Sequence, residues 1–83
     1  MNITLKLYAS LGTFLPRGSA RNAIDLDVAN GATIGEVLSQ HNVPRENCHL
    51  ILVNGNFAPP ASADGKQLTE GDTLAVWPPV AGG

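Results

Sequence analysis

The order of apolar periods along this chain constrains its fold more than any other feature. Residues 3–8 and 24–29 alternate apolar and polar side chains, which predicts two strands that each bury one face. Between residues 33 and 41 the apolar positions recur at helical spacing instead. Residues 50–53 and 73–77 then return to short apolar runs of strand length. The sequence therefore predicts strand, strand, helix, strand, a short strand and strand.

The helical segment has clear signals at its start and its end. Thr33 and Glu36 have the spacing of a capping box, in which each side chain accepts a hydrogen bond from the other residue's amide. Pro44 ends the helix or opens a further single turn through Asn47. One face of the helix is apolar, so we expect it to pack on the sheet.

The third strand and the loop after the first strand carry further signals. The apolar run 50–53 is continuous, which predicts a strand buried on both faces. Asn54-Gly55 supplies the positive φ values of a tight turn, and Phe57 begins a short return strand. Phe14 and Leu15 are expected to pin the first long loop onto the core.

These elements predict an α+β fold of the β-grasp, or ubiquitin-like, type. One main helix packed on a mixed sheet of four to five strands satisfies every apolar face with the fewest layers. The first and last strands are both apolar and are expected to lie side by side at the centre. A chain of 83 residues allows one domain, which we place at residues 1–77. Residues 78–83 are then a flexible C-terminal Gly-Gly tail.

Composition excludes several classes of partner. The net charge is −2 and Lys and Arg form no run, whereas phosphate backbones require clustered basic residues. We therefore expect no nucleic acid as a direct partner. The first residues do not have the pattern of a signal peptide, and no stretch is long enough to cross a bilayer. A cytoplasmic protein without a membrane partner is expected.

The only cysteine, Cys48, excludes an internal disulfide and fits a reducing compartment. We expect it to be a small buried apolar residue, and a role in sulfur transfer as a persulfide is the alternative. His41 and His49 have no spacing to Cys48, or to each other, that makes a metal site. We therefore expect no bound metal.

The sequence closes on two glycines, which present an unhindered carboxylate able to enter a narrow channel. Pro78-Pro79 has fixed φ angles and no amide hydrogens, so it leaves the sheet and holds an extended conformation. Val80 and Ala81 offer apolar contact in such a channel, and Gly82 gives the freedom to align the reacting carbon of Gly83. The alternative is a frayed end without function, which describes most chain termini.

Residues 71–83 closely resemble the end of the small subunit of molybdopterin synthase, with its Gly-Asp turn, strand, bulky aromatic residue, Pro-Pro-Val and Gly-Gly. Tyr8-Ala9-Ser10-Leu11, Gly31-Ala32-Thr33-Ile34 and Val53-Asn54-Gly55 are similar to other segments of that family. The sulfur carriers of thiamine thiazole synthesis and the eukaryotic ubiquitin-related modifier share the fold and the Gly-Gly end. The chain departs from the family at residues 12–16, where an Arg-Glu helix is common, which is compatible with a divergent branch and a different acceptor.

The resemblance implies a sulfur carrier rather than a complete enzyme. A ubiquitin-activating-type adenylating enzyme would use ATP to adenylate Gly83, and a sulfur nucleophile would then convert it to a thiocarboxylate. The large subunit of molybdopterin synthase would accept that sulfur for a pterin precursor, in a heterotetramer with two large subunits. The carrier itself would bind no cofactor. Neither the choice between molybdenum and tungsten nor the acceptor follows from the sequence.

Two aromatic residues are candidates for contact with those partners. Trp77 precedes the prolines, and aromatic residues are enriched at interface cores, so we predict that it forms a docking patch with Phe57. Pro78-Pro79, Val80 and Ala81 would extend the contact along the tail. Simple core packing is the alternative interpretation of Trp77.

Three other functions remain open at this stage. The first is sulfur donation to the thiazole of thiamine. The second is a protein modifier whose Gly83 forms an isopeptide bond with lysine. The third is a passive binding module that uses only the β-grasp surface, and this function predicts that the tail can be removed without loss.

Overall fold

The computed structural model describes residues 1–16, 19 and 22–79 of the chain. Within these residues no helix is long and apolar enough to cross a membrane. Three short 3₁₀ helices accompany one α-helix and five strands. In chain order the elements are β1 (Asn2–Leu7), η1 (Ala9–Phe14), β2 (Ala23–Asp27), α1 (Ile34–Gln40), η2 (Arg45–Asn47), β3 (Leu50–Val53), β4 (Asn56–Phe57), η3 (Pro60–Ser62) and β5 (Thr73–Trp77).

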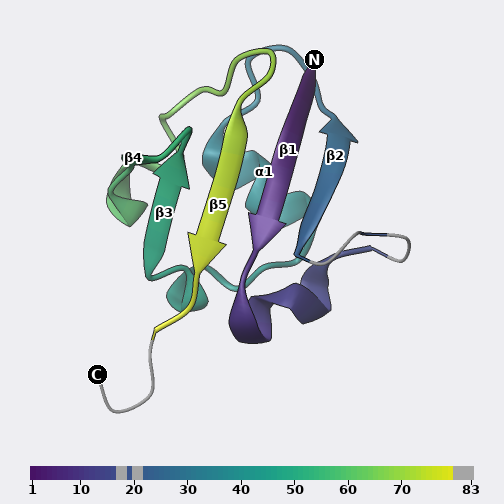
Figure 1. The fold of residues 1–83 in the computed structure, drawn as a ribbon. Helices are drawn as coiled ribbons and strands as arrows, with labels where there is room; N and C mark the ends of the chain where they lie inside the picture. The colour runs from purple at the N-terminus through teal and green to yellow at the C-terminus, as the bar shows by residue number, and fades with distance from the viewer. Residues whose placement is uncertain (17–18, 20–21, 80–83) are drawn as a thin grey trace.

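The strands form one mixed sheet in the order β2-β1-β5-β3-β4. Strand β1 pairs parallel with β5, and the other neighbours pair antiparallel. The predicted central pairing of the first and last strands is confirmed, and so is the hairpin of the first two. Figure 1 shows α1 behind the sheet, with the opposite face toward the viewer and the chain leaving the end of β5. The fold is therefore the predicted β-grasp.

The core lies between the sheet and α1. The alternating residues Ile3, Leu5 and Leu7 of β1 are almost fully buried, because their side chains share the face that the helix covers. Each buried side chain of this size contributes about 1.5–3 kcal/mol relative to an exposed one. The other strands and the helix supply matching residues: Ile34, Val37, Leu38, Ile51, Val53, Leu74 and Val76.

The start of α1 has the predicted capping box. The Thr33 hydroxyl accepts a hydrogen bond from the Glu36 amide at 3.1 Å, and the Glu36 carboxylate accepts one from the Thr33 amide at 3.0 Å. His41 caps the other end, and η2 forms the predicted single turn after Pro44. Two donors that a helix start leaves without partners are thereby satisfied.

Two sequence-based expectations differ from the structure. Residues 50–53 were expected to be buried on both faces, but only Ile51 and Val53 are buried, and Leu50 and Leu52 are half-exposed. That prediction is wrong, because one helix covers only one face of this sheet. The first long loop does contact the core through Phe14 and Leu15, as expected. It also contains η1, which the sequence did not predict.

A buried carboxylate joins the turn after β3 to the start of β5. Asp72 is 9% exposed and accepts hydrogen bonds from the Asn54 amide group, the Thr69 backbone amide and the Thr69 hydroxyl, at 2.8, 2.8 and 3.0 Å. Asn54, with φ of 52°, accepts one in turn from the Thr73 amide at 2.8 Å. Burial raises the pKa of Asp72, but the hydrogen bonds outweigh it, so the pKa lies below the ordinary value of an aspartate.

We expect Asp72→Asn to lower the free energy of unfolding by about 1–2 kcal/mol at pH 7, because an amide nitrogen cannot accept these hydrogen bonds. A depressed pKa stabilises the fold above the unfolded value of about 3.9, and this stabilisation is lost as the pH falls through the folded pKa. The difference in the free energy of unfolding between variant and wild type should therefore become smaller below about pH 4.

Urea unfolding of both proteins from pH 7 to pH 2.5 measures this difference. Glu46→Gln, which removes an exposed carboxylate, is the matched control, and it should leave the pH dependence of the free energy of unfolding nearly unchanged. A deficit in Asp72→Asn that persists undiminished in acid would contradict the assignment.

Candidate functional site

The base of the tail is fixed by hydrogen bonds on both sides of β5. The Tyr8 amide donates to the Val76 carbonyl at 3.1 Å, from the β1 side. From the β3 side, the His49 amide donates to the Trp77 carbonyl at 3.0 Å. The sheet therefore extends to Trp77, and the residues that follow are prolines, which have no amide hydrogen to continue it.

The face of the sheet opposite α1 is apolar at this end. Register pairs Trp77 with Leu50, and Leu52 with both Ala75 and Phe57, so all five side chains share the uncovered face. Phe57 is 62% exposed and is the only large hydrophobic residue found exposed among the described residues. We call Leu50, Leu52, Phe57, Ala75 and Trp77 the apolar patch; Ala75 is itself buried, and the other four residues provide the accessible surface.

The two aromatic residues predicted as a docking patch thus lie on the same face, on either side of β3. Trp77 is half-buried and is not part of the core cluster that packs against α1. This position favours the docking interpretation over core packing, since the apolar patch has no covering layer of secondary structure in the described chain. Contact with a partner stays a prediction.

Tyr8 is a residue of this site that the sequence analysis did not assign. Its ring stacks on that of Trp77, with the centroids 4.4 Å apart and an interplanar angle of 3°. The signal was present in the alternation along residues 3–8, which places Tyr8 on the uncovered face. The alternation alone does not assign Tyr8 to the site, because only the parallel pairing of β1 with β5 brings its ring beside that of Trp77.

Gly82 and Gly83, which are expected to carry the chemistry, and Val80 and Ala81, which are expected to contact a partner, lie outside the described residues. Their roles, and the division of the chain at residue 77, stay predictions. The described part of the tail consists of Pro78, which is half-buried, and Pro79, which is exposed. Neither belongs to a helix or strand, as expected for residues leaving a sheet.

Cys48 lies just before β3 and is 4% exposed, with its thiol 3.4 Å from the Pro44 carbonyl oxygen. Burial raises the pKa of the Cys48 thiol, although nearby Arg45 lowers it. The thiolate is the reactive form in sulfur chemistry, so this environment suppresses reactivity. The structure thus supports the expected role as a small buried apolar residue.

The two histidines lie on different segments of the chain. His41 ends α1 and His49 is exposed before β3. Across the described ranges no group of three or more His, Cys, Asp or Glu side chains is arranged to hold a metal ion.

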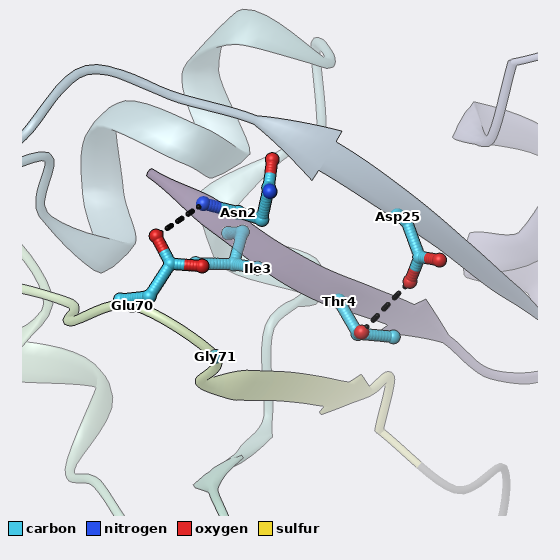
Figure 2. Close-up of a pocket in the computed structure, with 6 residues that line it drawn as sticks. All are labelled: Asn2, Ile3, Thr4, Asp25, Glu70 and Gly71. Atoms are coloured by element: carbon cyan, nitrogen blue, oxygen red, sulfur yellow. Dashed lines mark hydrogen bonds between the residues drawn. The ribbon is translucent and has the colours of Figure 1, made fainter.

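A separate polar pocket of about 400 Å³ lies at the other end of the sheet. The Glu70 carboxylate accepts a hydrogen bond from the Asn2 backbone amide at 3.0 Å, and Asp25 accepts one from the Thr4 hydroxyl at 2.9 Å (Figure 2). Because Thr4 pairs with Thr73 at the start of β5, the pocket is remote from the base of the tail. The pocket is lined by Asn2, Ile3, Thr4, Asp25, Glu70 and Gly71.

The fold and the proline-led end of β5 define a ubiquitin-like protein. Residues 1–82 match the profile of the family described as Mut7-C ubiquitin, and the chain belongs to that family. The comparison with curated proteins gives no match.

Solved structures share the β-grasp fold. SAMP1 from Haloferax volcanii is 26% identical, with a TM-score of 0.68 and 100% of each chain covered. A molybdopterin converting factor subunit 1 from Pyrococcus furiosus is 16% identical over 95% of this chain and 98% of its own, with a TM-score of 0.68. A complex of subunits 1 and 2 of molybdopterin-converting factor from Helicobacter pylori contains a chain that is 19% identical, with a TM-score of 0.58 and 100% of each chain covered. The last two likenesses show the fold alone.

The burial of Cys48 leads to a reactivity prediction. We expect the native thiol to react with iodoacetamide at pH 8 at least 100-fold more slowly than the thiol of the urea-unfolded chain, because reaction requires local opening. Mass spectrometry of timed samples measures both rates. A native rate within tenfold of the unfolded rate would show an accessible thiol and would reopen a role in sulfur transfer.

Proposed function

We propose that this protein is a sulfur carrier whose Gly83 is converted to a thiocarboxylate. The observation that carries the proposal is the arrangement at the end of β5, where the last sheet hydrogen bond of the described residues falls on Trp77 and Pro78-Pro79 follows. A β-grasp body thus ends in a stiff segment that leads to Gly82 and Gly83. The proposal requires that Gly83 bear the free α-carboxylate of the mature protein.

The chemistry overcomes the poor electrophilicity of a carboxylate. The Gly83 carboxylate attacks the α-phosphate of ATP and releases pyrophosphate, which leaves an acyl-adenylate. Hydrosulfide, or an equivalent sulfur nucleophile, then attacks the acyl carbon and displaces AMP, which is a good leaving group. The product is a thiocarboxylate, whose sulfur attacks an electrophilic carbon of the acceptor. Water then cleaves the acyl carbon–sulfur bond, which leaves the sulfur on the acceptor and returns the Gly83 carboxylate.

Partners supply the ATP site and the acceptor in this proposal. An adenylating enzyme of the ubiquitin-activating type binds ATP, so the carrier itself holds no cofactor. From Pro78 the tail reaches about 20 Å at roughly 3.3 Å per residue, which is enough to enter a partner's active site. The apolar patch would dock the body of the carrier while the tail is inserted.

The proposed acceptor is the pterin precursor of the molybdenum or tungsten cofactor, held by a large subunit. Two structural neighbours are described as subunits of molybdopterin-converting factor, and one of them is a complex of subunits 1 and 2. Such a complex supports a large subunit as the second partner. The resemblance of residues 71–83 to the small subunit supports the same pathway.

A second candidate is covalent protein modification. It is favoured by the 26% identity to SAMP1, a small archaeal modifier protein, across the whole chain. In that case a lysine amine, rather than a sulfur nucleophile, attacks the activated Gly83 and forms an isopeptide bond. Adducts in host lysate that resist reductant would favour modification, whereas a thiocarboxylate without adducts would favour sulfur transfer.

An alanine appended after Gly83 tests the requirement for a terminal glycine. We expect pyrophosphate release with the host's adenylating enzyme to fall to background, because the added methyl group blocks a channel shaped for glycine. The melting temperature should be unchanged, which serves as the folding control. The proposal fails if the appended variant still turns over ATP at the rate of the wild type.

Truncation of the apolar patch tests its role in docking. Phe57→Ala should raise the dissociation constant for the adenylating enzyme about tenfold or more, while the free energy of unfolding changes by less than about 0.5 kcal/mol. Trp77→Ala should also weaken binding by more than it lowers stability. Calorimetry of binding and urea unfolding measure the two effects.

Gln40→Ala, on the exposed side of α1, is the matched control and should change neither quantity. If Phe57→Ala leaves the affinity unchanged, the patch is not the docking surface. Equal losses of binding and stability in Trp77→Ala would support simple packing for that residue.

A further inference from the structure

Tyr8 lies where the chain leaves β1, and no step of the proposed function uses it. We infer that Tyr8 is a positioning residue for the tail: its ring holds Trp77 and so fixes the direction in which Pro78-Pro79 leaves the sheet. This inference rests on the proposed function, because a fixed direction matters only if a partner receives the tail.

Tyr8 is attached to the end of β5 by a backbone hydrogen bond to Val76 and by the stacking of its ring on Trp77. The Tyr8 amide donates to the Val76 carbonyl at 3.1 Å, one residue before Trp77. The two rings lie nearly parallel, 3° apart, at a centroid distance of 4.4 Å. Stacked rings in register with a hydrogen-bonded backbone leave the indole few alternative rotamers, so its orientation is set from β1.

The backbone on the far side of Tyr8 is strained and anchored. Ala9 has a φ of 52°, in the left-handed region that alanine rarely adopts. The conformation is held by η1, where the Leu11 amide donates to the Tyr8 carbonyl at 3.0 Å and the Leu11 side chain is in the core. Strained residues of this kind persist where the surrounding structure fixes them, and they cluster at functional sites.

Trp77 is also held from the β3 side, through the hydrogen bond of its carbonyl with the His49 amide. The next residue, Pro78, restricts Trp77 to extended backbone angles and has a fixed φ itself. Pro79 repeats the restriction. The backbone direction at Trp77 therefore determines the direction of Pro78 and Pro79, because the φ angles of both prolines are fixed.

A tail that leaves the sheet in a fixed direction needs less ordering when a partner binds it. Loss of the stack should thus weaken productive binding while leaving the bound chemistry intact, which raises KM and spares kcat. For one aromatic pair we expect KM for the carrier to rise about fivefold.

Three variants separate positioning from a general loss of stability. Tyr8→Leu removes the stack, Tyr8→Phe keeps the ring, and Phe14→Leu removes a half-buried aromatic residue from the same segment without touching the stack. Trp77 is the only tryptophan, so time-resolved fluorescence anisotropy reports its motion without a label. Pyrophosphate release by the host's adenylating enzyme, with the carrier as varied substrate, gives KM and kcat.

The inference predicts that Tyr8→Leu widens the nanosecond motion of the Trp77 indole and raises KM about fivefold, with kcat within twofold of the wild type. Tyr8→Phe should have the indole motion and the KM of the wild type, because it keeps the ring. Phe14→Leu should also leave both unchanged. A raised KM with unchanged indole motion would mean that Tyr8 touches the partner directly, and it would overturn the inference. So would wider motion without a change in KM.

The same experiment separates this inference from the proposed function. If the adenylating enzyme does not act on the wild type, the proposed function fails, and the fluorescence alone decides whether Tyr8 orders Trp77. If the wild type is adenylated and Tyr8→Leu matches it in both readouts, the proposed function stands and the positioning role is wrong.

Discussion

The parallel pairing of β1 with β5 is the constraint on which the rest of the structure depends. It places Leu5 opposite Leu74 at the centre of the sheet, where α1 buries both. The same pairing brings the residue after β1 beside the last residue of β5, so Tyr8 meets Trp77 at the base of the tail. Core formation and the placement of the candidate site therefore follow from one set of backbone hydrogen bonds.

A single covering helix has a second consequence. Figure 1 shows α1 on one face of the sheet only. Leu50, Leu52 and Trp77, whose side chains point to the other face, stay partly exposed in the described chain. Burial of such side chains against a partner is favourable, since apolar surface is removed from water. Phe57, on the short edge strand, enlarges this surface, which is the one proposed to dock a partner.

The sequence was sufficient for the features that depend on local periodicity and local hydrogen bonding. The succession of strands and α-helix along the chain, the capping box at Thr33 and the turn at Asn54 all follow from residues close in the chain. The half-exposure of Leu50 was not predictable in that way, because an apolar run does not show how many layers cover it. The stack of Tyr8 on Trp77 joins residues far apart in sequence, so it required the observed register.

The central claim is that Gly83 carries sulfur, and intact mass of the protein purified natively from its host tests it most directly. We expect a chain that ends at Gly83 and a mass increase equal to the exchange of one oxygen for sulfur, mapped to that residue. It is contradicted if the chain continues past Gly83. It is equally contradicted if the mass stays unmodified after incubation with ATP, a sulfide donor and the host's adenylating enzyme.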